Sequence, residues 1–354
     1  MSELGITIDG RNITAEKGNT ILEICQKNGI HVPTLCYHPR LRVVGTCRVC
    51  VVEVEGESRL TSACSTPVER EGMVVYTKSE RVLEARRMVV ELLLAGGGDH
   101  NCLYCDGNAR CELQDLAYEL RIEQTRFPID QPAWDIDTSN PMIFRDLNKC
   151  ILCGRCVRAC NEVQVNKVID FGYRGHRGKI VTNGDKDYAD STCVFCGECV
   201  QVCPTGALVE QKARFGGRPW EAKVVTSTCV YCGTGCSIDL HVVDGKVVKI
   251  TGTEDGVVNK GSLCVKGRFG YDFIHHEDRL KTPLIKENGS FREASWDEAL
   301  GMVATRLGEI KNTYGSDSIG GLSSARCTNE ENYLLQKFMR AVMGTNNIDH
   351  CARL

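Results

Sequence analysis

The sequence predicts an α+β protein divided into several small modules, each held together partly by bound metal. Three observations lead to this fold class. Cysteine accounts for 22 of the 354 residues, and most of these cysteines stand in short, regularly spaced groups. Aromatic residues make up only 6% of the chain, whereas glycine contributes 35 residues. Small modules organised by thiolate-bound metal fit this composition better than one large apolar core.

The composition also argues against several classes of protein. The net charge of −3 favours neither nucleic acid nor an anionic membrane as a partner. The N-terminal segment is polar and strand-like, without the features of a signal peptide. The apolar runs of the chain stay well short of the roughly 18 residues that a membrane span needs. We therefore expect a cytoplasmic, reducing compartment in which thiolates bind metal.

Residues 1–78 are expected to form two hairpins with a helix between them. The first hairpin turns at Asp9-Gly10, and the second joins strands at Val49–Val54 and Ser58–Ser62. Four cysteines with the spacing C-x10-C-x2-C-x13-C lie around the second hairpin: Cys36, Cys47, Cys50 and Cys64. This order resembles the β-grasp [2Fe-2S] domain of complex I and iron hydrogenases. The resemblance implies that the four cysteines hold one [2Fe-2S] cluster.

Residues 79–120 begin with a helix that Ser79 caps, followed by His100, Cys102, Cys105 and Cys111. The segment resembles the one-histidine, three-cysteine [4Fe-4S] module of complex I and iron hydrogenases. That family places its histidine four residues before the first cysteine, where this chain has Gly98. We expect His100 to be the fourth ligand, because imidazole suits iron. The alternative is another group in that position.

Residues 140–212 contain two runs with the spacing C-x2-C-x2-C-x3-C, which is the bacterial ferredoxin pattern for two [4Fe-4S] clusters. The fourth cysteine of each run ligates the cluster of the other run in such pairs. One predicted set is Cys150, Cys153, Cys156 and Cys203, and the other is Cys193, Cys196, Cys199 and Cys160. Structural zinc is the alternative, but zinc sites seldom use two complete four-cysteine runs.

Residues 222–278 contain a third type of spacing, C-x2-C-x3-C-x27-C, at Cys229, Cys232, Cys236 and Cys264. The flanking segments CVYCGTGCSIDL and KGSLCVKGRFG resemble the [4Fe-4S] domain of molybdenum and tungsten bis-pterin oxidoreductases. The resemblance implies a fourth [4Fe-4S] cluster here and places Lys266 between it and the pterin, as an electron relay. The alternative for Lys266 is an ordinary solvated side chain.

Residues 279–354 resemble the start of the pterin-binding α/β domain of the same enzymes. The expected elements are a helix at Trp296–Lys311, a strand at Ser318–Leu322 and a second helix through Val342. Arg326 and Asn329, in the loop after the strand, are the candidate contacts to the pterin.

The final segment, GTNNIDHCARL, resembles the part of formate dehydrogenase catalytic subunits that precedes the active-site selenocysteine or cysteine. We expect a selenocysteine UGA codon directly after Leu354, read as a stop. The chain would then be a fragment of a longer enzyme that lacks the catalytic residues. The alternative is a naturally short electron-transfer subunit.

Together the resemblances imply the electron-transferring iron–sulfur part of the alpha subunit of a cytoplasmic formate dehydrogenase. This enzyme converts formate to CO2 and relays the electrons through one [2Fe-2S] and four [4Fe-4S] clusters. The full-length enzyme would also carry molybdenum- or tungsten-bis-molybdopterin guanine dinucleotide. The expected partner is a flavin- and NAD(P)-binding iron–sulfur subunit, or a ferredoxin or hydrogenase subunit. The alternatives are a complex I-type large iron–sulfur subunit, an iron hydrogenase, or a stand-alone electron carrier.

Overall fold

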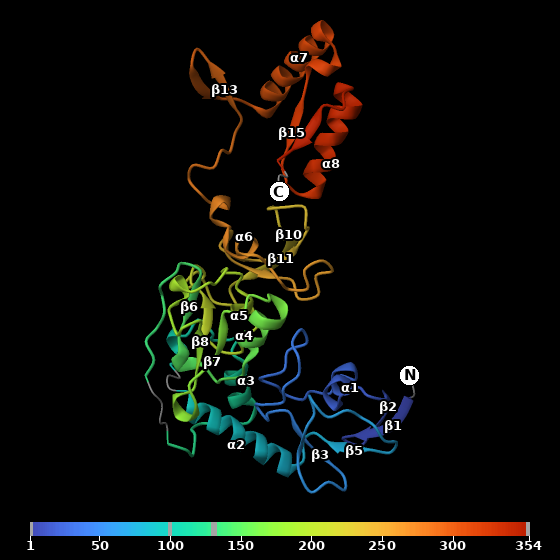
Figure 1. Ribbon diagram of the computed structural model, residues 1–354, viewed down its shortest axis with the longest axis vertical. Helices are drawn as coiled ribbons and strands as arrows, with labels where there is room; N and C mark the ends of the chain where they lie inside the picture. The colour runs from blue at the N-terminus through green and yellow to red at the C-terminus, as the bar shows by residue number, and fades with distance from the viewer. Residues whose placement is uncertain (1–2, 98–100, 129–132, 352–354) are drawn as a thin grey trace. The chain divides into compact units, whose positions relative to one another are not determined.

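The computed structural model describes residues 3–97, 101–128 and 133–351 (Figure 1). The chain divides into two compact units, Met1–Glu221 and Ala222–Leu354, and each is described by itself. Both units combine short strands with short helices. The predicted α+β class is therefore confirmed.

The first unit begins with a five-stranded sheet in the order β2-β1-β5-β3-β4. Strands β1 and β5 are parallel, and the other neighbours are antiparallel. Helix α1 (Ile21–Lys27) begins with a capping box between Thr20 and Glu23, and it buries Ile21 and Leu22 in the core under the sheet. The strands are β1 (Glu3–Ile8), β2 (Arg11–Glu16), β3 (Val51–Val54), β4 (Thr61–Ser62) and β5 (Val74–Tyr76).

Two helices follow this sheet, α2 (Glu80–Gly96) and α3 (Glu112–Glu119). The Ser79 side chain caps α2, as the sequence predicts. Arg86 of α2 is 2% exposed, and its guanidinium donates to the carbonyl oxygens of Val49 and Val51 at 3.1 and 2.8 Å. This buried arginine therefore fixes α2 to strand β3. A short turn, η1 (Cys102–Tyr104), lies between the two helices.

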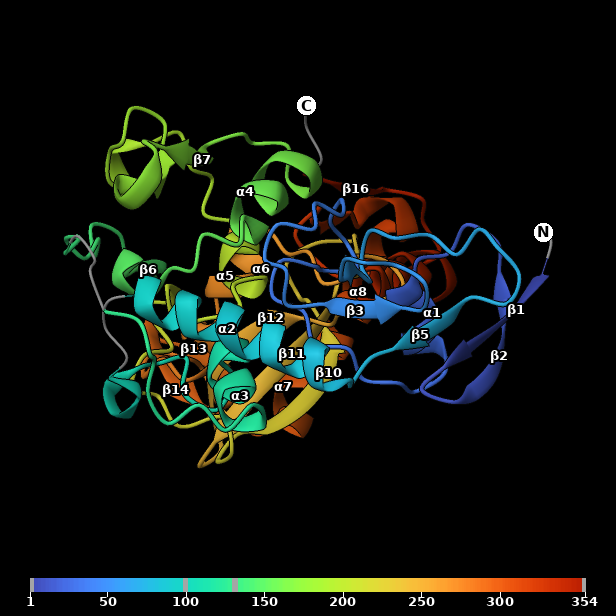
Figure 2. The same ribbon diagram turned by 90° about the horizontal axis from the view of Figure 1, so that it is seen from below.

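The rest of the first unit is built from small elements around two cysteine runs. Strands β6 (Ile143–Arg145) and β9 (Leu208–Glu210) pair with each other, and so do β7 (Ile169–Gly172) and β8 (Lys179–Thr182). The second pair forms a hairpin between the two runs, and its first strand, β7, is labelled in Figure 2. The remaining elements are α4 (Arg155–Arg158), α5 (Glu198–Gln201), η2 (Leu147–Lys149), η3 (Ala159–Val163), η4 (Gly175–Arg177) and η5 (Tyr188–Asp190).

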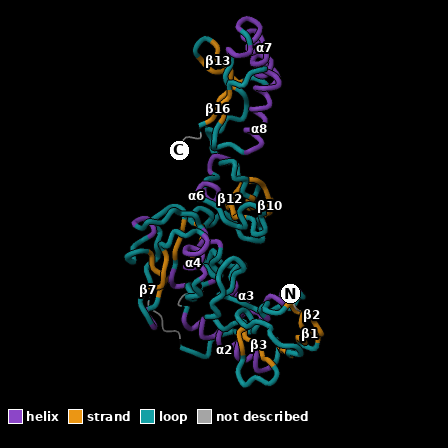
Figure 3. The backbone as a smooth tube through the Cα atoms, turned by 45° about the vertical axis from the view of Figure 1, so that its right-hand side comes forward, coloured by secondary structure: helices purple, strands orange, loops and turns teal. Residues whose placement is uncertain are grey.

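The second unit begins with an antiparallel sheet in the order β10-β11-β12, whose strands are orange in Figure 3. Its strands are β10 (Lys223–Thr228), β11 (Ser237–Val243) and β12 (Lys246–Gly252). Helix α6 (Val265–Phe269) and the turn η6 (Asp272–Ile274) follow.

The C-terminal part of the second unit contains two helices beside a parallel strand pair. The predicted strand at Ser318–Leu322 is displaced, because Ser316–Ser318 forms a 3-10 turn after the left-handed Gly315. The elements are β13 (Leu284–Glu287), β14 (Ser290–Glu293), α7 (Trp296–Tyr314), η7 (Ser316–Ser318), β15 (Gly321–Ser323), α8 (Asn329–Lys337), η8 (Phe338–Met343) and β16 (Ile348–His350).

The cores of this part are small. Ile319, Met339 and Met343 form one buried cluster, whereas α7 buries none of its residues. The described helices are all too short or too polar to cross a bilayer.

Candidate metal centres

Each of the 22 cysteines is a free thiol, and the predicted ligand groups are gathered by different local structures. In the first group, Cys36, Cys50 and Cys64 are each 1% exposed. A hydrogen bond from the Cys47 thiol lowers the pKa of Cys36 to about 5, and one from Cys64 lowers the pKa of Cys50 to about 7. The structure therefore places the four thiols of this group side by side in pairs.

The loop that carries Cys47 has an unusual backbone. Gly45 and Arg48 both adopt left-handed conformations, with φ of 61° and 59°. A side chain at residue 45 would also crowd the Ser65 hydroxyl at 3.2 Å. The glycine thus lets the loop fold tightly around the thiols.

The second group, Cys102, Cys105 and Cys111, is more open. Burial raises the pKa of Cys111 to about 11, and the neighbouring Cys105 and Cys102 contribute to the shift. The Gly107 N–H donates to the Cys105 sulfur at 3.3 Å. A Cβ at Gly206 would lie 2.4 Å from the same sulfur, so only glycine allows the turn after Cys203 to approach it. His100 lies outside the described residues, and its role stays a prediction.

The first ferredoxin-type set faces one small cavity. Cys150, Cys153, Cys156 and Cys203 all line it, together with apolar side chains. Burial raises the pKa of Cys150 and of Cys153 to about 12. The structure therefore brings three cysteines of the first run together with the fourth cysteine of the second.

The second set has the reciprocal arrangement. Burial raises the pKa of Cys199 well above its ordinary value, and the charges that add to this effect come from Cys196, Cys193 and Cys160. Three cysteines of the second run thus lie near the fourth cysteine of the first.

The two runs have matching backbones. Leu152 and Phe195 occupy equivalent positions with φ of 53° and 51°, and their N–H groups donate to Cys150 and Cys193 sulfurs at 3.4 and 3.3 Å. The following glycines also match, with φ of 70° at Gly154 and 76° at Gly197. Backbone N–H groups pointed at sulfur suit a negatively charged cluster.

Buried polar side chains connect the sites of the first unit. Arg158, 8% exposed, donates to the carbonyl oxygens of Cys36 at 2.5 Å and Cys153 at 3.4 Å. Arg40 pairs with the 1% exposed Glu198 at 3.1 Å. These contacts join the Cys36 loop to both cysteine runs.

The Cys111 segment is attached to the same region. The carboxylate of Glu112 accepts two hydrogen bonds from Arg155, and its N–H donates to the Pro204 carbonyl at 2.8 Å. Such paired bonds between guanidinium and carboxylate fix orientation as well as distance. The four cysteine groups of the first unit are therefore held at defined positions relative to one another.

In the second unit, Cys229 is buried, Cys232 and Cys236 are half-buried and Cys264 is exposed. The Thr234 hydroxyl lowers the pKa of Cys232, and the Lys266 ammonium adds a smaller contribution. Lys266 therefore lies close to this group of cysteines. Asn329 donates to the Gly233 carbonyl at 2.7 Å, whereas Arg326 is exposed.

The donor sets can be compared with what metals require. Within the described ranges, no three His, Cys, Asp or Glu side chains converge as they would around a single ion. Structural zinc places its four ligands at about 2.0–2.3 Å from one centre. Groups of four thiols that line a cavity, with backbone N–H groups directed at sulfur, have the chemistry that iron–sulfur clusters use.

Sequence reasoning missed three buried polar residues of these sites, Arg86, Arg158 and Tyr188. Tyr188 is 1% exposed, and its hydroxyl lies 3.7 Å from the Cys199 sulfur. Arg158 stands inside a cysteine run, where a long charged side chain must find a buried acceptor. That placement was the one signal available in the sequence.

Comparisons with known proteins divide the chain among five sequence families. Residues 2–80 match the 2Fe-2S iron-sulfur cluster binding domain, and residues 86–126 match the NADH-ubiquinone oxidoreductase-G iron-sulfur binding region. Residues 149–207 match the 4Fe-4S dicluster domain. Residues 222–276 match the molybdopterin oxidoreductase Fe4S4 domain, and residues 279–354 match molybdopterin oxidoreductase. The chain thus combines iron–sulfur domains with a segment that matches molybdopterin oxidoreductase.

The names of proteins that are similar to this chain describe several different activities. The chain is 40% identical to "NADPH-Fe(3+) oxidoreductase subunit alpha" of Geobacter sulfurreducens and 35% identical to "Putative formate dehydrogenase YrhE" of Bacillus subtilis. These matches cover 99% and 100% of the chain but 40% of each relative. The chain thus spans about two fifths of the length of these relatives.

A solved structure is also similar to part of this chain. A chain of the NAD+-reducing [NiFe]-hydrogenase in its H2-reduced state is 33% identical, with a TM-score of 0.56. The match covers 60% of this chain and 90% of the hydrogenase chain. An NADH-quinone oxidoreductase component from Rhizobium meliloti is 38% identical over 98% of this chain and 40% of its own length.

Proposed function

We propose that the chain is the electron-transferring iron–sulfur part of a cytoplasmic, NAD(P)- or ferredoxin-linked formate dehydrogenase. The observation that carries the proposal is the joining of thiol-lined sites by buried side chains. Arg158 contacts the backbone of Cys36 and of Cys153, and Glu112 contacts Arg155 and the segment after Cys203. A relay needs its carriers at fixed, short separations, and these contacts supply that fixation.

The proposed ligands are the residues named from the sequence, with His100 as the fourth ligand of the Cys102 group. When bound, iron–sulfur clusters supply one-electron redox chemistry. The chain's own residues hold the thiols, direct N–H groups at sulfur, and exclude water from Cys150, Cys153 and Cys156. Burial keeps these thiols protonated until metal replaces the proton, since it raises their pKa values.

The second unit supplies the proposed contact with the pterin cofactor of the full-length enzyme. Lys266 contributes positive charge next to Cys232, which favours an added electron nearby. Asn329 is hydrogen-bonded to Gly233 of the cysteine loop, so it connects that loop to the first turn of α8. Arg326 is exposed, in the loop between β15 and α8. These placements support Lys266 as the relay residue and leave Arg326 and Asn329 as proposed pterin contacts.

Formate is proposed as the substrate because of the resemblance at the C-terminal segment and the relative named as a formate dehydrogenase. The full-length enzyme would use molybdenum- or tungsten-bis-molybdopterin guanine dinucleotide to oxidise formate to CO2. The proposed partner is a flavin- and NAD(P)-binding subunit. The selenocysteine codon after Leu354 stays a prediction, which sequencing of the reading frame beyond that codon tests.

A second candidate is a relay for electrons from NAD(P)H, without formate. The 40% identical relative named as an NADPH-Fe(3+) oxidoreductase favours it. The experiment that separates the two is reduction of the purified native complex under anaerobic conditions, followed by electron paramagnetic resonance (EPR). Appearance of cluster signals with formate supports the dehydrogenase. Signals with NAD(P)H and none with formate support the second candidate.

A further inference from the structure

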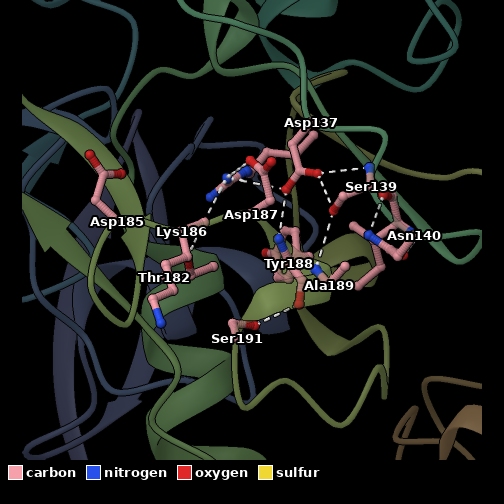
Figure 4. Close-up of polar contacts among 12 residues, drawn as sticks. Asp137, Ser139, Asn140, Thr182, Asp185, Lys186, Asp187, Tyr188, Ala189 and Ser191 are labelled. Atoms are coloured by element: carbon pink, nitrogen blue, oxygen red, sulfur yellow. Dashed lines mark hydrogen bonds and ion pairs between the residues drawn. The ribbon is translucent and has the colours of Figure 1, made fainter.

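Tyr188 is held rigidly at the beginning of η5. Its backbone N–H donates to the Asp137 carboxylate at 2.9 Å, and its carbonyl accepts from the Ser191 hydroxyl at 2.7 Å (Figure 4). The guanidinium of Arg145 lies over its ring, 5.0 Å from the centroid, and is paired with Asp137 at 3.2 Å. Arg145 therefore holds the face of the ring, and the two hydrogen bonds hold the backbone of Tyr188.

The hydroxyl at the other end of this ring faces sulfur. It lies 3.7 Å from the Cys199 sulfur, within reach of a sulfur hydrogen bond. A cysteine that ligates iron is a thiolate and has no hydrogen to give, so the tyrosine must be the donor. In the part of the chain that the structure describes, the Tyr188 hydroxyl has no second polar partner. Its hydrogen is thus available to sulfur alone.

The equivalent position of the first run lacks such a donor. Cys156 corresponds to Cys199 and lines a cavity with Arg145 and Thr205, but among the described residues no side chain donates a hydrogen bond to its sulfur. Cys203, of the same set, has the Thr205 hydroxyl at 3.8 Å. However, Thr205 donates its single hydrogen to the Lys149 carbonyl at 2.8 Å. The two cysteine runs have matching backbones, but in the described part of the chain only the second has a side-chain hydroxyl, that of Tyr188, free to donate to a ligating sulfur.

We propose that Tyr188 donates a hydrogen bond to the ligating sulfur of Cys199 and thereby raises the reduction potential of the cluster at the Cys193, Cys196, Cys199 and Cys160 set. This inference rests on the proposed ligand sets. Adding an electron increases the negative charge on the ligating sulfurs, and a hydrogen aimed at sulfur stabilises that charge. The cluster at the Cys150 set receives no such contribution, so the hydroxyl separates the potentials of two otherwise similar sites.

The test is Tyr188→Phe in the full chain, purified anaerobically with its clusters and titrated by EPR-monitored potentiometry. Phenylalanine keeps the ring under Arg145 and removes only the hydroxyl. We expect the reduction equilibrium of one [4Fe-4S] cluster to become about tenfold less favourable, which is about 59 mV for a one-electron couple. The other clusters keep their potentials. An unchanged potential at every cluster overturns the proposal.

Two control variants make the result specific. Tyr173→Phe removes a hydroxyl that bonds Asp185 at 2.8 Å on the β7–β8 hairpin, away from sulfur, and should shift nothing. Thr205→Val removes the hydroxyl whose hydrogen is already committed to Lys149, and should also leave the potentials unchanged. A shift as large with either control as with Tyr188→Phe overturns the proposal.

A separate variant distinguishes failure of the ligand assignment from failure of this inference. Cys199→Ala should abolish or alter the same signal that Tyr188→Phe shifts. If it leaves that signal intact, the proposed ligand set is wrong. If the Tyr188→Phe protein does not acquire this cluster, the test is instead proton electron–nuclear double resonance on the unaltered protein. An exchangeable hydrogen coupled to that cluster, beyond the backbone N–H groups, supports the hydrogen bond, and its absence in D2O-exchange difference spectra overturns it.

Discussion

Helix α1 of the N-terminal sheet module and helix α7 of the second unit differ in how much of their surface is buried. Helix α1 has seven residues and buries four of them, with Ile21 and Leu22 fully buried. Helix α7 has nineteen residues and buries none, and Leu300 and Val303 on it are 58% and 53% exposed. The difference shows that an amphipathic pattern specifies a helix, whereas a covering layer decides whether that helix contributes to stability.

The same contrast between buried and exposed groups applies to ion pairs. Here we expect the largest loss in the free energy of unfolding. Arg40→Met removes the guanidinium that pairs with the 1% exposed Glu198, and breaking such a buried pair costs about 3–5 kcal/mol. The matched change Arg292→Met breaks an exposed pairing with Glu287 and Glu298, where solvent screens the charges. Hydrogen exchange across a urea series measures the free energy of unfolding for each unit. Equal losses for both variants would contradict the comparison.

Truncating one leucine in each helix is the next test. Leu22→Ala in α1 removes fully buried methyl groups, and we expect a loss of about 2–5 kcal/mol in the unfolding free energy of the N-terminal module. Leu300→Ala in α7 should stay within about 0.5 kcal/mol, because the side chain is mostly in solvent. The same exchange measurement applies. A large loss at Leu300 would mean that another surface covers α7 in solution.

A smaller effect is expected where a buried arginine joins two sites. Arg158→Met deprives the buried carbonyl of Cys36 and the partly buried carbonyl of Arg42 of their donor, which costs about 1–3 kcal/mol. Hydrogen exchange should accelerate in residues 36–47 and leave α7 unaffected. Arg174→Met, on the exposed turn after β7, is the control and should change neither region. Unchanged exchange in residues 36–47 would show that Arg158 does not hold this loop.

The subtlest difference concerns the pH dependence of iron loading. Burial raises the pKa of Cys150 and Cys153 to about 12, so these thiols are protonated at pH 7 and must lose protons to bind metal. Loading of this set should therefore strengthen as the pH rises. In the Cys229 set burial also raises the pKa of Cys229 and of Cys236, but the Thr234 hydroxyl lowers the pKa of Cys232, so we expect loading at this set to depend less on pH.

Anaerobic reconstitution between pH 6.5 and 8.5, with EPR as the readout, measures this difference. Thr234→Val removes the hydroxyl and should make the pH dependence of the Cys229 set steeper. A steeper dependence at the Cys229 set than at the Cys150 set in the unaltered protein would reverse the comparison.

Local signals in the sequence were sufficient for much of the fold. The Ser79 cap, the hairpin that turns at Asp9-Gly10 and the helix that begins at Trp296 depend on nearby residues, and the structure contains each of them. The grouping of cysteines could also be named, because metal-binding spacing is a property of short loops. The shift of the strand expected at Ser318–Leu322 was not predictable, since Gly315 permits a left-handed turn but does not require one.

The contacts that complete the sites could not be predicted. Arg158 and Cys36 are 122 residues apart, so nothing near either residue indicates that they meet. Tyr188 reaches Cys199 only because Asp137, 51 residues earlier, holds its backbone. Such contacts arise from tertiary packing, which a periodic pattern does not encode.

The pairing of Arg40 with Glu198 has a consequence for synthesis of the chain. The two residues are separated by 158 positions, so Arg40 leaves the ribosome well before its partner exists. At about 5–20 residues per second, the wait is on the order of 8–30 s. Arg158 is made before Glu198, so for most but not all of that interval the Cys36 loop lacks both of these contacts. The nascent chain thus offers a time window for delivering metal that closes when the second cysteine run is made.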